Sequence, residues 1–191
     1  MGLTDLPDDL PIPEDDGRAD HLLGMALPSV PLPSTSGGTV DLSSAGGTRW
    51  LVVYIYPMTG RPDEALPDGW EAIPGARGCT PQSCAFRDHH GALRALDATV
   101  FGLSAQDTGY QQEMAARLHL PYEVLSDASG AFGAALDLPT MTVTMTDGTD
   151  ARLYKRLTLI ARSGVIEHTM YPVFPPDLNA SHVEAWLTAQ A

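Results

Sequence analysis

Residues 50–57 read WLVVYIYP, and residues 78–88 read GCTPQSCAFRD. The first stretch is a continuous β-branched and aromatic run that ends at a proline, which is typical of a central strand covered on both faces. In the second, Thr80 and Pro81 suit the cap and the first position of a helix, and apolar side chains recur at helical intervals as far as Leu96. The sequence therefore predicts a buried strand, a long loop over residues 58–73 beside the chemistry, and a helix from about Pro81 to Leu96.

The two cysteines differ in their predicted surroundings. Unpaired backbone N–H groups and the helix dipole favour an anion at a first helical turn, so Cys79 is expected to be the nucleophilic thiolate. Arg77 lies two residues upstream, and a nearby guanidinium would stabilise the thiolate further. Cys84 falls inside the helix, where backbone N–H groups are already bonded, and it is expected to be an ordinary thiol.

The spacing of the cysteines predicts that oxidation is coupled to local unfolding. Five steps along a helix separate two Cα atoms by roughly 7.5 Å, which is beyond the ~7 Å limit for a disulfide. A bond between Cys79 and Cys84 therefore requires the first helical turn to unwind. Gly75 and Gly78 lower the cost of that step because glycine permits unusual backbone angles.

The remaining pattern predicts an α/β fold. Strands are expected at 99–104 and 123–126, each joined to the next element by a helix, and residues 152–161 and 165–171 have the pattern of an antiparallel hairpin before a terminal helix. Two strand–helix units followed by a hairpin imply a mixed central sheet with helices on both faces, and this arrangement matches the thioredoxin-like fold.

Composition sets the class of protein and of partner. A chain of 191 residues with 43% hydrophobic content needs one core only, so we expect an acidic, proline-containing N-terminal arm over 1–26 and one domain over 27–191. The formal net charge of −13 disfavours nucleic acid and membrane surfaces as partners. The N-terminus lacks a basic-then-apolar pattern and the apolar runs are short, which predicts a soluble, cytoplasmic protein.

The cysteine pair alone leaves other interpretations open. Two nearby cysteines can be small buried apolar residues, and His89 and His90 on the same helix raise the possibility of zinc. Structural zinc sites use four ligands at tighter paired spacing, so no metal is expected, and the two histidines are given no role.

The two quoted stretches resemble peroxiredoxins of the bacterioferritin comigratory protein class, also called the peroxiredoxin Q class, and the likeness extends from about Leu27 to the terminal helix. The resemblance implies that Cys79 is the peroxidatic cysteine, that Cys84 is the resolving cysteine, and that Arg156 is the active-site arginine. It further implies that Pro57 shields the site and that Gln82 positions neighbouring groups. The implied activity is a thioredoxin-dependent, atypical two-cysteine peroxidase that needs a hydroperoxide, a thioredoxin-like reductant and no cofactor. Because the class contains monomers, a monomer is expected.

One position departs from the family pattern. The family carries a threonine three residues before the peroxidatic cysteine, where this chain has Ala76. The segment between Pro57 and Cys79 is also longer than in the family. We expect this loop to fold back and offer the Thr59 hydroxyl to the peroxide, with Thr80 as a second possible donor.

Three other functions compete with the peroxidase hypothesis. A peroxide-sensing redox switch would use the same oxidation to signal through a bound protein. A dithiol oxidoreductase of protein disulfides is a further alternative, but that chemistry favours two intervening residues rather than four. A thioredoxin-like module that only binds partners would need the cysteine, the glycines and Arg156 to occur together by chance.

Overall fold

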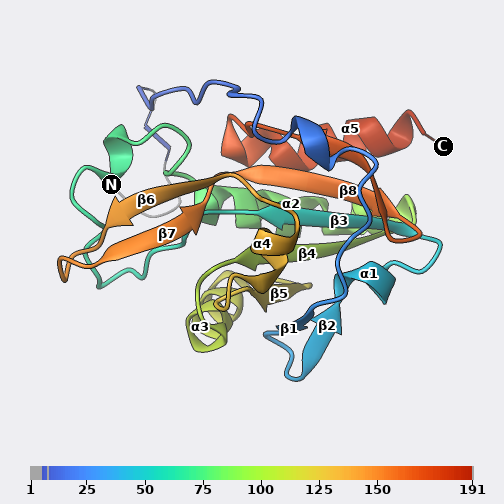
Figure 1. Cartoon of the computed structure of the whole chain (residues 1–191), viewed down its shortest axis with the longest axis horizontal. Coiled ribbons are helices and arrows are strands. Elements are labelled where there is room, and N and C mark those ends of the chain that lie inside the picture. The colour runs from blue at the N-terminus through green and yellow to red at the C-terminus, as the bar shows by residue number, and fades with distance from the viewer. Residues whose placement is uncertain (1–5, 8, 191) are drawn as a thin grey trace.

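A computed structural model describes residues 6, 7 and 9–190, and a five-stranded mixed sheet lies at its centre (Figure 1). The sheet order is β5-β4-β3-β8-β9, with bounds Glu123–Ser126, Ala98–Ser104, Trp50–Ile55, Leu157–Arg162 and Val165–Met170. Strand β3 pairs in parallel with β4, which pairs in parallel with β5, whereas β8 is antiparallel to both β3 and β9. The apolar run predicted as a central strand is therefore β3, and its side chains from Leu51 to Ile55 are buried.

Three helices cover one face of the sheet. They are α2 (Cys79–Ala95), α3 (Thr108–Leu118) and α5 (Asn179–Thr188), the last preceded by the short helix η3 (Pro176–Leu178). Right-handed crossovers from β3 to β4 and from β4 to β5 place α2 and α3 on the same side. Their apolar faces meet Val52 and Tyr54 of β3 in one buried cluster that also contains Phe86, Met114 and Val183.

The opposite face is covered by α4 (Ala131–Ala135) and by the N-terminal segment. That segment contains η1 (Asp20–Leu22), the paired strands β1 (Pro31–Pro33) and β2 (Thr39–Asp41), and α1 (Leu42–Ala45). In Figure 1, α4 lies in front of the sheet and α2 behind it. The fold is thus α/β and thioredoxin-like, with helices on both faces of a mixed sheet, as predicted.

The acidic segment, which is the N-terminal arm predicted over residues 1–26, contacts the rest of the chain over part of its length. Ala19 and Leu22 are buried in the core cluster on the α4 side. Asp5 and Asp8, two of its acidic residues, lie outside the described residues. The division at residue 26 stays a prediction.

A separate hairpin corrects the prediction of one strand over residues 152–161. Strand β7 (Asp150–Tyr154) pairs with β6 (Thr140–Thr144), whereas β8 starts at Leu157 in the main sheet, so the chain leaves one sheet and enters another at Lys155 and Arg156. The two strands read as one in the sequence because no glycine or proline separates Tyr154 from Leu157.

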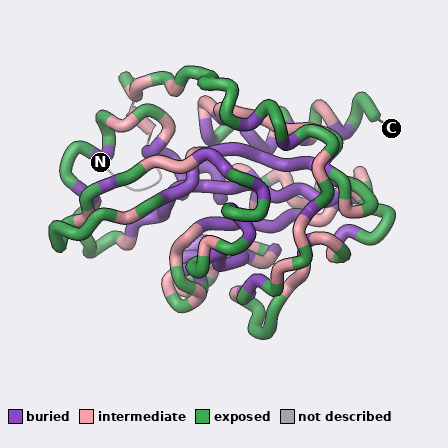
Figure 2. The backbone as a smooth tube through the Cα atoms, in the orientation of Figure 1, coloured by how far each residue is buried: buried purple, intermediate pink, exposed green. Residues whose placement is uncertain are grey.

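This hairpin forms a small third core with the loop over residues 58–73. The loop includes the short helix η2 (Trp70–Ala72), and Met58 and Trp70 pack there with Val143 and Leu153. Figure 2 shows the central strands as buried, while the tip of the hairpin is exposed. Among the described residues, no helix combines the length and apolarity needed to cross a bilayer.

Candidate active site

Helix α2 begins at Cys79, two residues earlier than predicted. Gly78 occupies the N-cap position with a φ of +104°, and the first helical hydrogen bond runs from the Gln82 N–H to the Gly78 carbonyl, 3.0 Å. A Cβ on Gly78 would overlap Cγ of Pro176, so this position requires glycine for space as well as for its backbone angle. Thr80 therefore lies inside the first turn and is not the cap.

The Cys79 sulfur contacts the Arg156 guanidinium. Cys79 is 3% exposed, and its Sγ lies 3.1 Å from Nη2 of Arg156 and 3.6 Å from the Ala76 carbonyl oxygen. The same Nη2 donates to the carbonyls of Gly75, Ala76 and Arg77 at 3.2, 3.1 and 3.1 Å. One guanidinium nitrogen thus holds both the sulfur and the loop that leads to it.

A buried polar chain fixes the other side of Arg156. Its Nη1 donates to Oε1 of Gln82, and Nε2 of Gln82 donates to Oδ1 of Asn179 at 2.9 Å. The same Asn179 oxygen accepts from the Thr158 hydroxyl at 2.8 Å. Gln82 therefore contacts both Arg156 and Asn179, and its role in positioning the arginine stays a prediction. Asn179 was missed by sequence reasoning, since a single asparagine at the start of a helix signals a cap rather than a contact with a distant strand.

A small recess opens at Cys79. It has a volume of about 10 Å³ and is lined by nine residues, Met58, Thr59, Gly60, Leu66, Trp70, Arg77, Gly78, Cys79 and Thr80. The loop over residues 58–73 thus folds back onto the cysteine, as predicted. Pro57 is buried just before this segment but does not line the recess.

Thr59 already has a hydrogen-bond partner in the recess. Its hydroxyl donates to Oε1 of Gln106 at 3.2 Å, and its backbone N–H donates to the same oxygen at 2.9 Å. Nε2 of Gln106 returns a hydrogen bond to the Thr59 carbonyl at 3.0 Å. The hydroxyl proton is therefore engaged, and the free lone pair of Thr59 Oγ1 is available to accept a hydrogen bond.

Cys84 has different surroundings, although it lies on the same helix. Both cysteines are free thiols, and burial raises the pKa of the Cys84 thiol. Next to it, the Tyr54 hydroxyl donates to Ser83 Oγ at 3.1 Å and pairs with the Tyr122 hydroxyl at 3.0 Å. The Tyr54 ring stacks on Phe86 with centroids 4.4 Å apart. These contacts hold the second turn of α2, which carries Cys84, on the sheet and so restrain its movement toward Cys79.

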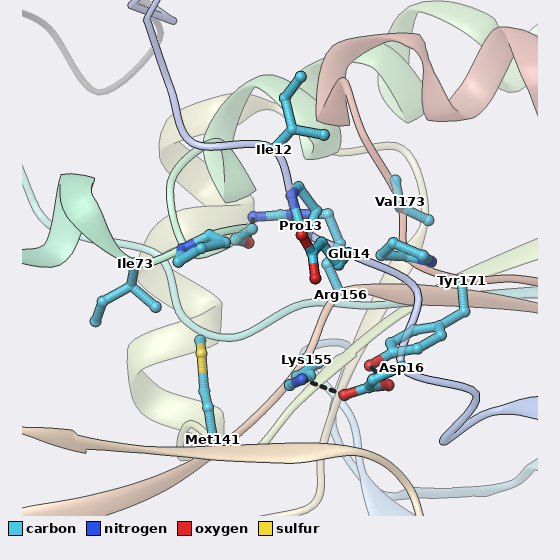
Figure 3. A pocket seen from close by; sticks show the side chains of 13 residues that line it. Ile12, Pro13, Glu14, Asp16, Ile73, Met141, Lys155, Arg156, Tyr171 and Val173 are labelled. Atoms are coloured by element: carbon cyan, nitrogen blue, oxygen red, sulfur yellow. Dashed lines mark hydrogen bonds and ion pairs between the residues drawn. The ribbon is translucent and has the colours of Figure 1, made fainter.

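A larger cavity lies beside Arg156 (Figure 3). It has a volume of about 430 Å³, and both Gly75 and Arg156 reach it, but Cys79 is not part of its lining. The acidic segment forms one wall, where Asp16 pairs with Lys155 at 2.6 Å and accepts from the Tyr171 hydroxyl at 2.7 Å. The hydrogen bond from Lys155 lowers the pKa of Asp16 to about 2.

The chain is similar in sequence to known peroxiredoxins. The family model described as Redoxin matches residues 22–187. Peroxiredoxin bcp1 of Schizosaccharomyces pombe is 29% identical over 133 residues, which cover 66% of this chain and 60% of that protein. Peroxiredoxin Q, chloroplastic, of Oryza sativa subsp. japonica is 27% identical over 154 residues, which cover 81% of this chain and 61% of that protein. The alignments thus span about 60% of the length of these curated relatives.

Solved structures show the same fold. Peroxidoxin BcpB from Mycobacterium tuberculosis superposes with a TM-score of 0.70 at 23% identity, covering 88% of this chain and 97% of that one. Peroxiredoxin Q from Xanthomonas campestris superposes with a TM-score of 0.66 at 21% identity, covering 95% and 98%. Because the Redoxin model matches nearly the whole chain, the protein belongs to the redoxin family, and the relatives that it resembles in sequence are named peroxiredoxins of the Bcp and Q types.

Proposed function

We propose that this protein is a thiol peroxidase that reduces hydroperoxides with Cys79. The observation that supports this most directly is the Cys79 sulfur at the N-terminus of a 17-residue helix, 3.1 Å from the Arg156 guanidinium. Helix N-terminal N–H groups and a guanidinium both stabilise a thiolate, which is the form that attacks peroxide.

In the first step, the Cys79 thiolate attacks the terminal oxygen of a hydroperoxide ROOH along the O–O bond. An S–O bond forms, the O–O bond breaks, and the leaving RO⁻ takes a proton from solvent to give ROH. Sulfur is oxidised to a sulfenic acid and the peroxide is reduced. Arg156 and the backbone N–H groups of the first turn stabilise the developing oxyanion, while Thr59 Oγ1 accepts a hydrogen bond from the peroxide O–H. Pro57, which is buried just before this loop, limits the approach of water in the proposed mechanism.

In the second step, Cys84 condenses with the sulfenic acid. The Cys84 S–H proton and the sulfenic OH leave as water, and a Cys79–Cys84 disulfide forms once the first turn of α2 has unwound. The raised pKa of Cys84 suits a thiol that acts second. A thioredoxin-like dithiol then reduces the disulfide by exchange, in a reducing compartment such as the cytoplasm, and the proposed working form is a monomer.

The test is stopped-flow oxidation of the reduced protein by hydrogen peroxide, followed by Trp fluorescence. Cys79→Ser is expected to abolish the reaction. Cys84→Ser should leave the first step fast but prevent formation of the disulfide. Mass spectrometry of this variant should then detect a persistent sulfenic acid on Cys79. A wild-type protein that reacts no faster than a free thiol would refute the peroxidase assignment.

A further inference from the structure

The acidic segment lies against the loop that leads to Cys79. A Cβ built on Gly75 would stand 3.5 Å from the Pro13 ring, and one built on Gly78 would stand 3.1 Å from Cδ2 of Leu6. Pro13 and Leu6 therefore fill the space that the two glycines leave open. These are the glycines that are expected to ease unwinding of the first turn of α2. The segment thus packs on the part of the chain that has to move during oxidation.

Polar contacts at Asp16 anchor the segment beside this loop. Asp16 pairs with Lys155 at 2.6 Å and accepts from the Tyr171 hydroxyl at 2.7 Å (Figure 3). Lys155 directly precedes Arg156, and Nη2 of Arg156 donates to the Gly75 carbonyl at 3.2 Å. The loop at Gly75 is therefore held both by the active-site arginine and by the acidic segment.

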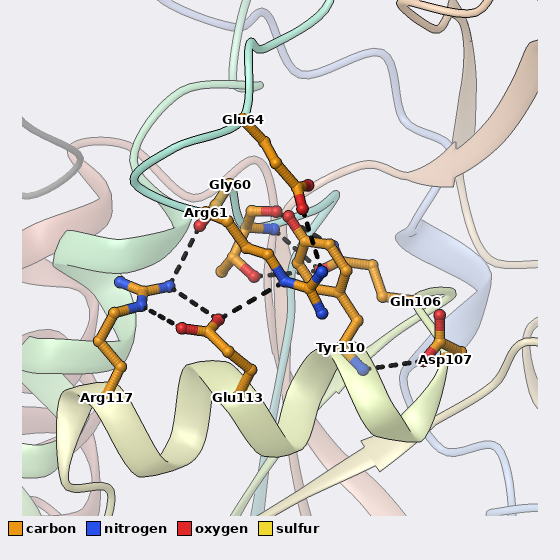
Figure 4. A network of polar contacts seen from close by, with 9 residues as sticks. Gly60, Arg61, Glu64, Gln106, Asp107, Tyr110, Glu113 and Arg117 are labelled. Atoms are coloured by element: carbon orange, nitrogen blue, oxygen red, sulfur yellow. Dashed lines mark hydrogen bonds and ion pairs between the residues drawn. The ribbon is translucent and has the colours of Figure 1, made fainter.

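Other residues of the recess are attached without the acidic segment (Figure 4). Nε2 of Gln106 donates to the Thr59 carbonyl at 3.0 Å, and Arg117 of α3 donates to the Gly60 carbonyl at 3.1 Å. These bonds do not depend on the contacts of Pro13 or Asp16. Loosening of the acidic segment is therefore expected to free the Gly75 side of the site while Thr59 and Gly60 stay in place.

We propose that the acidic segment is a strap that holds the Cys79 loop in its folded form and is released when the Cys79–Cys84 disulfide forms. This inference rests on the proposed peroxidase function and adds a control on its second step. The contacts at Gly75 and Gly78 exist only while the loop is folded, so the strap stabilises the dithiol and slows unwinding of the first turn. Because such coupling is reciprocal, the disulfide weakens docking of the segment to the same extent.

The rate test compares two isosteric substitutions in the segment. Asp16→Asn weakens the anchor, whereas Glu14→Gln removes the same charge from an exposed side chain two residues away. Rapid mixing with hydrogen peroxide, acid quenching and mass spectrometry follow the sulfenic acid and the disulfide separately. Asp16→Asn should form the disulfide about five-fold faster, which corresponds to one ordinary hydrogen bond, with the first step unchanged. Glu14→Gln should match the wild type in both steps.

A second pair of variants tests the apolar contacts of the strap. Leu6→Ala shortens a half-buried side chain that lies against Gly78, so it should also speed disulfide formation a few-fold. Ile12→Ala is the control, because Ile12 is 71% exposed and its truncation removes little packing. This variant should form the disulfide at the wild-type rate.

Release of the strap is measured by amide exchange over residues 12–18. The dithiol is compared with the disulfide made with diamide, which oxidises thiols without peroxide, and exchange should be faster in the disulfide. Equal exchange in the two forms, or equal rates of disulfide formation in Asp16→Asn and Glu14→Gln, would overturn the strap and leave the peroxidase proposal intact. A wild type that ignores hydrogen peroxide, yet releases the segment after diamide, would overturn the proposed function alone. Failure of Cys79 and Cys84 to pair with either oxidant would overturn both.

Discussion

Gly78→Ala is expected to destabilise the fold through two separable effects at the start of α2. The first is the backbone angle, because a side chain at φ +104° costs roughly 1–2 kcal/mol. The second is the overlap of the new Cβ with Pro176, and overpacking of this kind costs about 1–3 kcal/mol. Loss of glycine freedom in the unfolded chain offsets about 0.4–1 kcal/mol. The expected net loss in the free energy of unfolding is therefore about 1.5–4 kcal/mol.

A double-mutant cycle separates the two effects. Pro176→Ala removes the ring Cγ that the new Cβ would overlap, so in that background Gly78→Ala should keep the backbone cost and only the milder 3.1 Å contacts with Leu6 Cδ2 and with Cβ of residue 176. The coupling between the two sites is then about 1–3 kcal/mol, which is large for residues 98 positions apart in the sequence. Urea unfolding of the reduced proteins, followed by Trp fluorescence, measures all four free energies.

Gly91→Ala in the same helix is the control. A Cβ at Gly91 would meet nothing within 4 Å, so this change should stabilise the helix by about 0.5–1 kcal/mol. If Gly78→Ala lies within 0.5 kcal/mol of the wild type, or costs the same with and without Pro176, the account of how α2 begins is wrong.

Three further predictions concern the site and the acidic segment. Thr59→Val should lower kcat/KM for every hydroperoxide by about ten-fold, because an acceptor worth about 1–1.5 kcal/mol is lost; near-normal steady-state kinetics would exclude the role of Thr59. Tyr54→Phe removes the hydroxyl bonded to Ser83 but keeps the ring, so stopped-flow traces should show Cys79–Cys84 disulfide formation up to ten-fold faster, and an unchanged rate would contradict the role assigned to this bond. Asp16 has a pKa of about 2 in the folded protein against 3.8 in the unfolded chain. Its contribution to stability is therefore complete above about pH 4 and is lost as the pH falls toward 2. Amide exchange over residues 12–18 should rise in that window in the wild type and stay flat in Asp16→Asn, and identical profiles would refute the assignment.

The sequence was most informative where local chemistry and burial coincide. The apolar run at 50–56 could only be a central strand, and a cysteine beside Thr80 and Pro81 could be placed at a helix N-terminus to within two residues. The exact start of α2 was missed because it depends on Pro176, a residue of another element that only the folded chain brings to Gly78.

Other features depended on contacts that no local pattern records. The change of sheet at Lys155 and Arg156 follows from which strands are free to pair, and no glycine or proline marks it in the sequence. The hydrogen bond from Gln82 to Asn179 joins two helices 97 residues apart. The third core was equally hidden, since loop length suggested a role near the chemistry but not which hairpin the loop would pack against.

The third core gives the loop over residues 58–73 and the β6–β7 hairpin a measure of evolutionary independence. The apolar side chains of the loop and the hairpin pack mainly on each other. The two principal cores lie elsewhere, one between the main sheet and the helices α2, α3 and α5, and the other on the α4 side of the sheet. The unit is not insulated from the chemistry, because Leu66 lines the recess at Cys79 and the Ala76 carbonyl of this core accepts a hydrogen bond from Arg156. Insertion and substitution are therefore tolerated best at the exposed tip of the hairpin, whereas the side chains of the unit that face Cys79 are constrained.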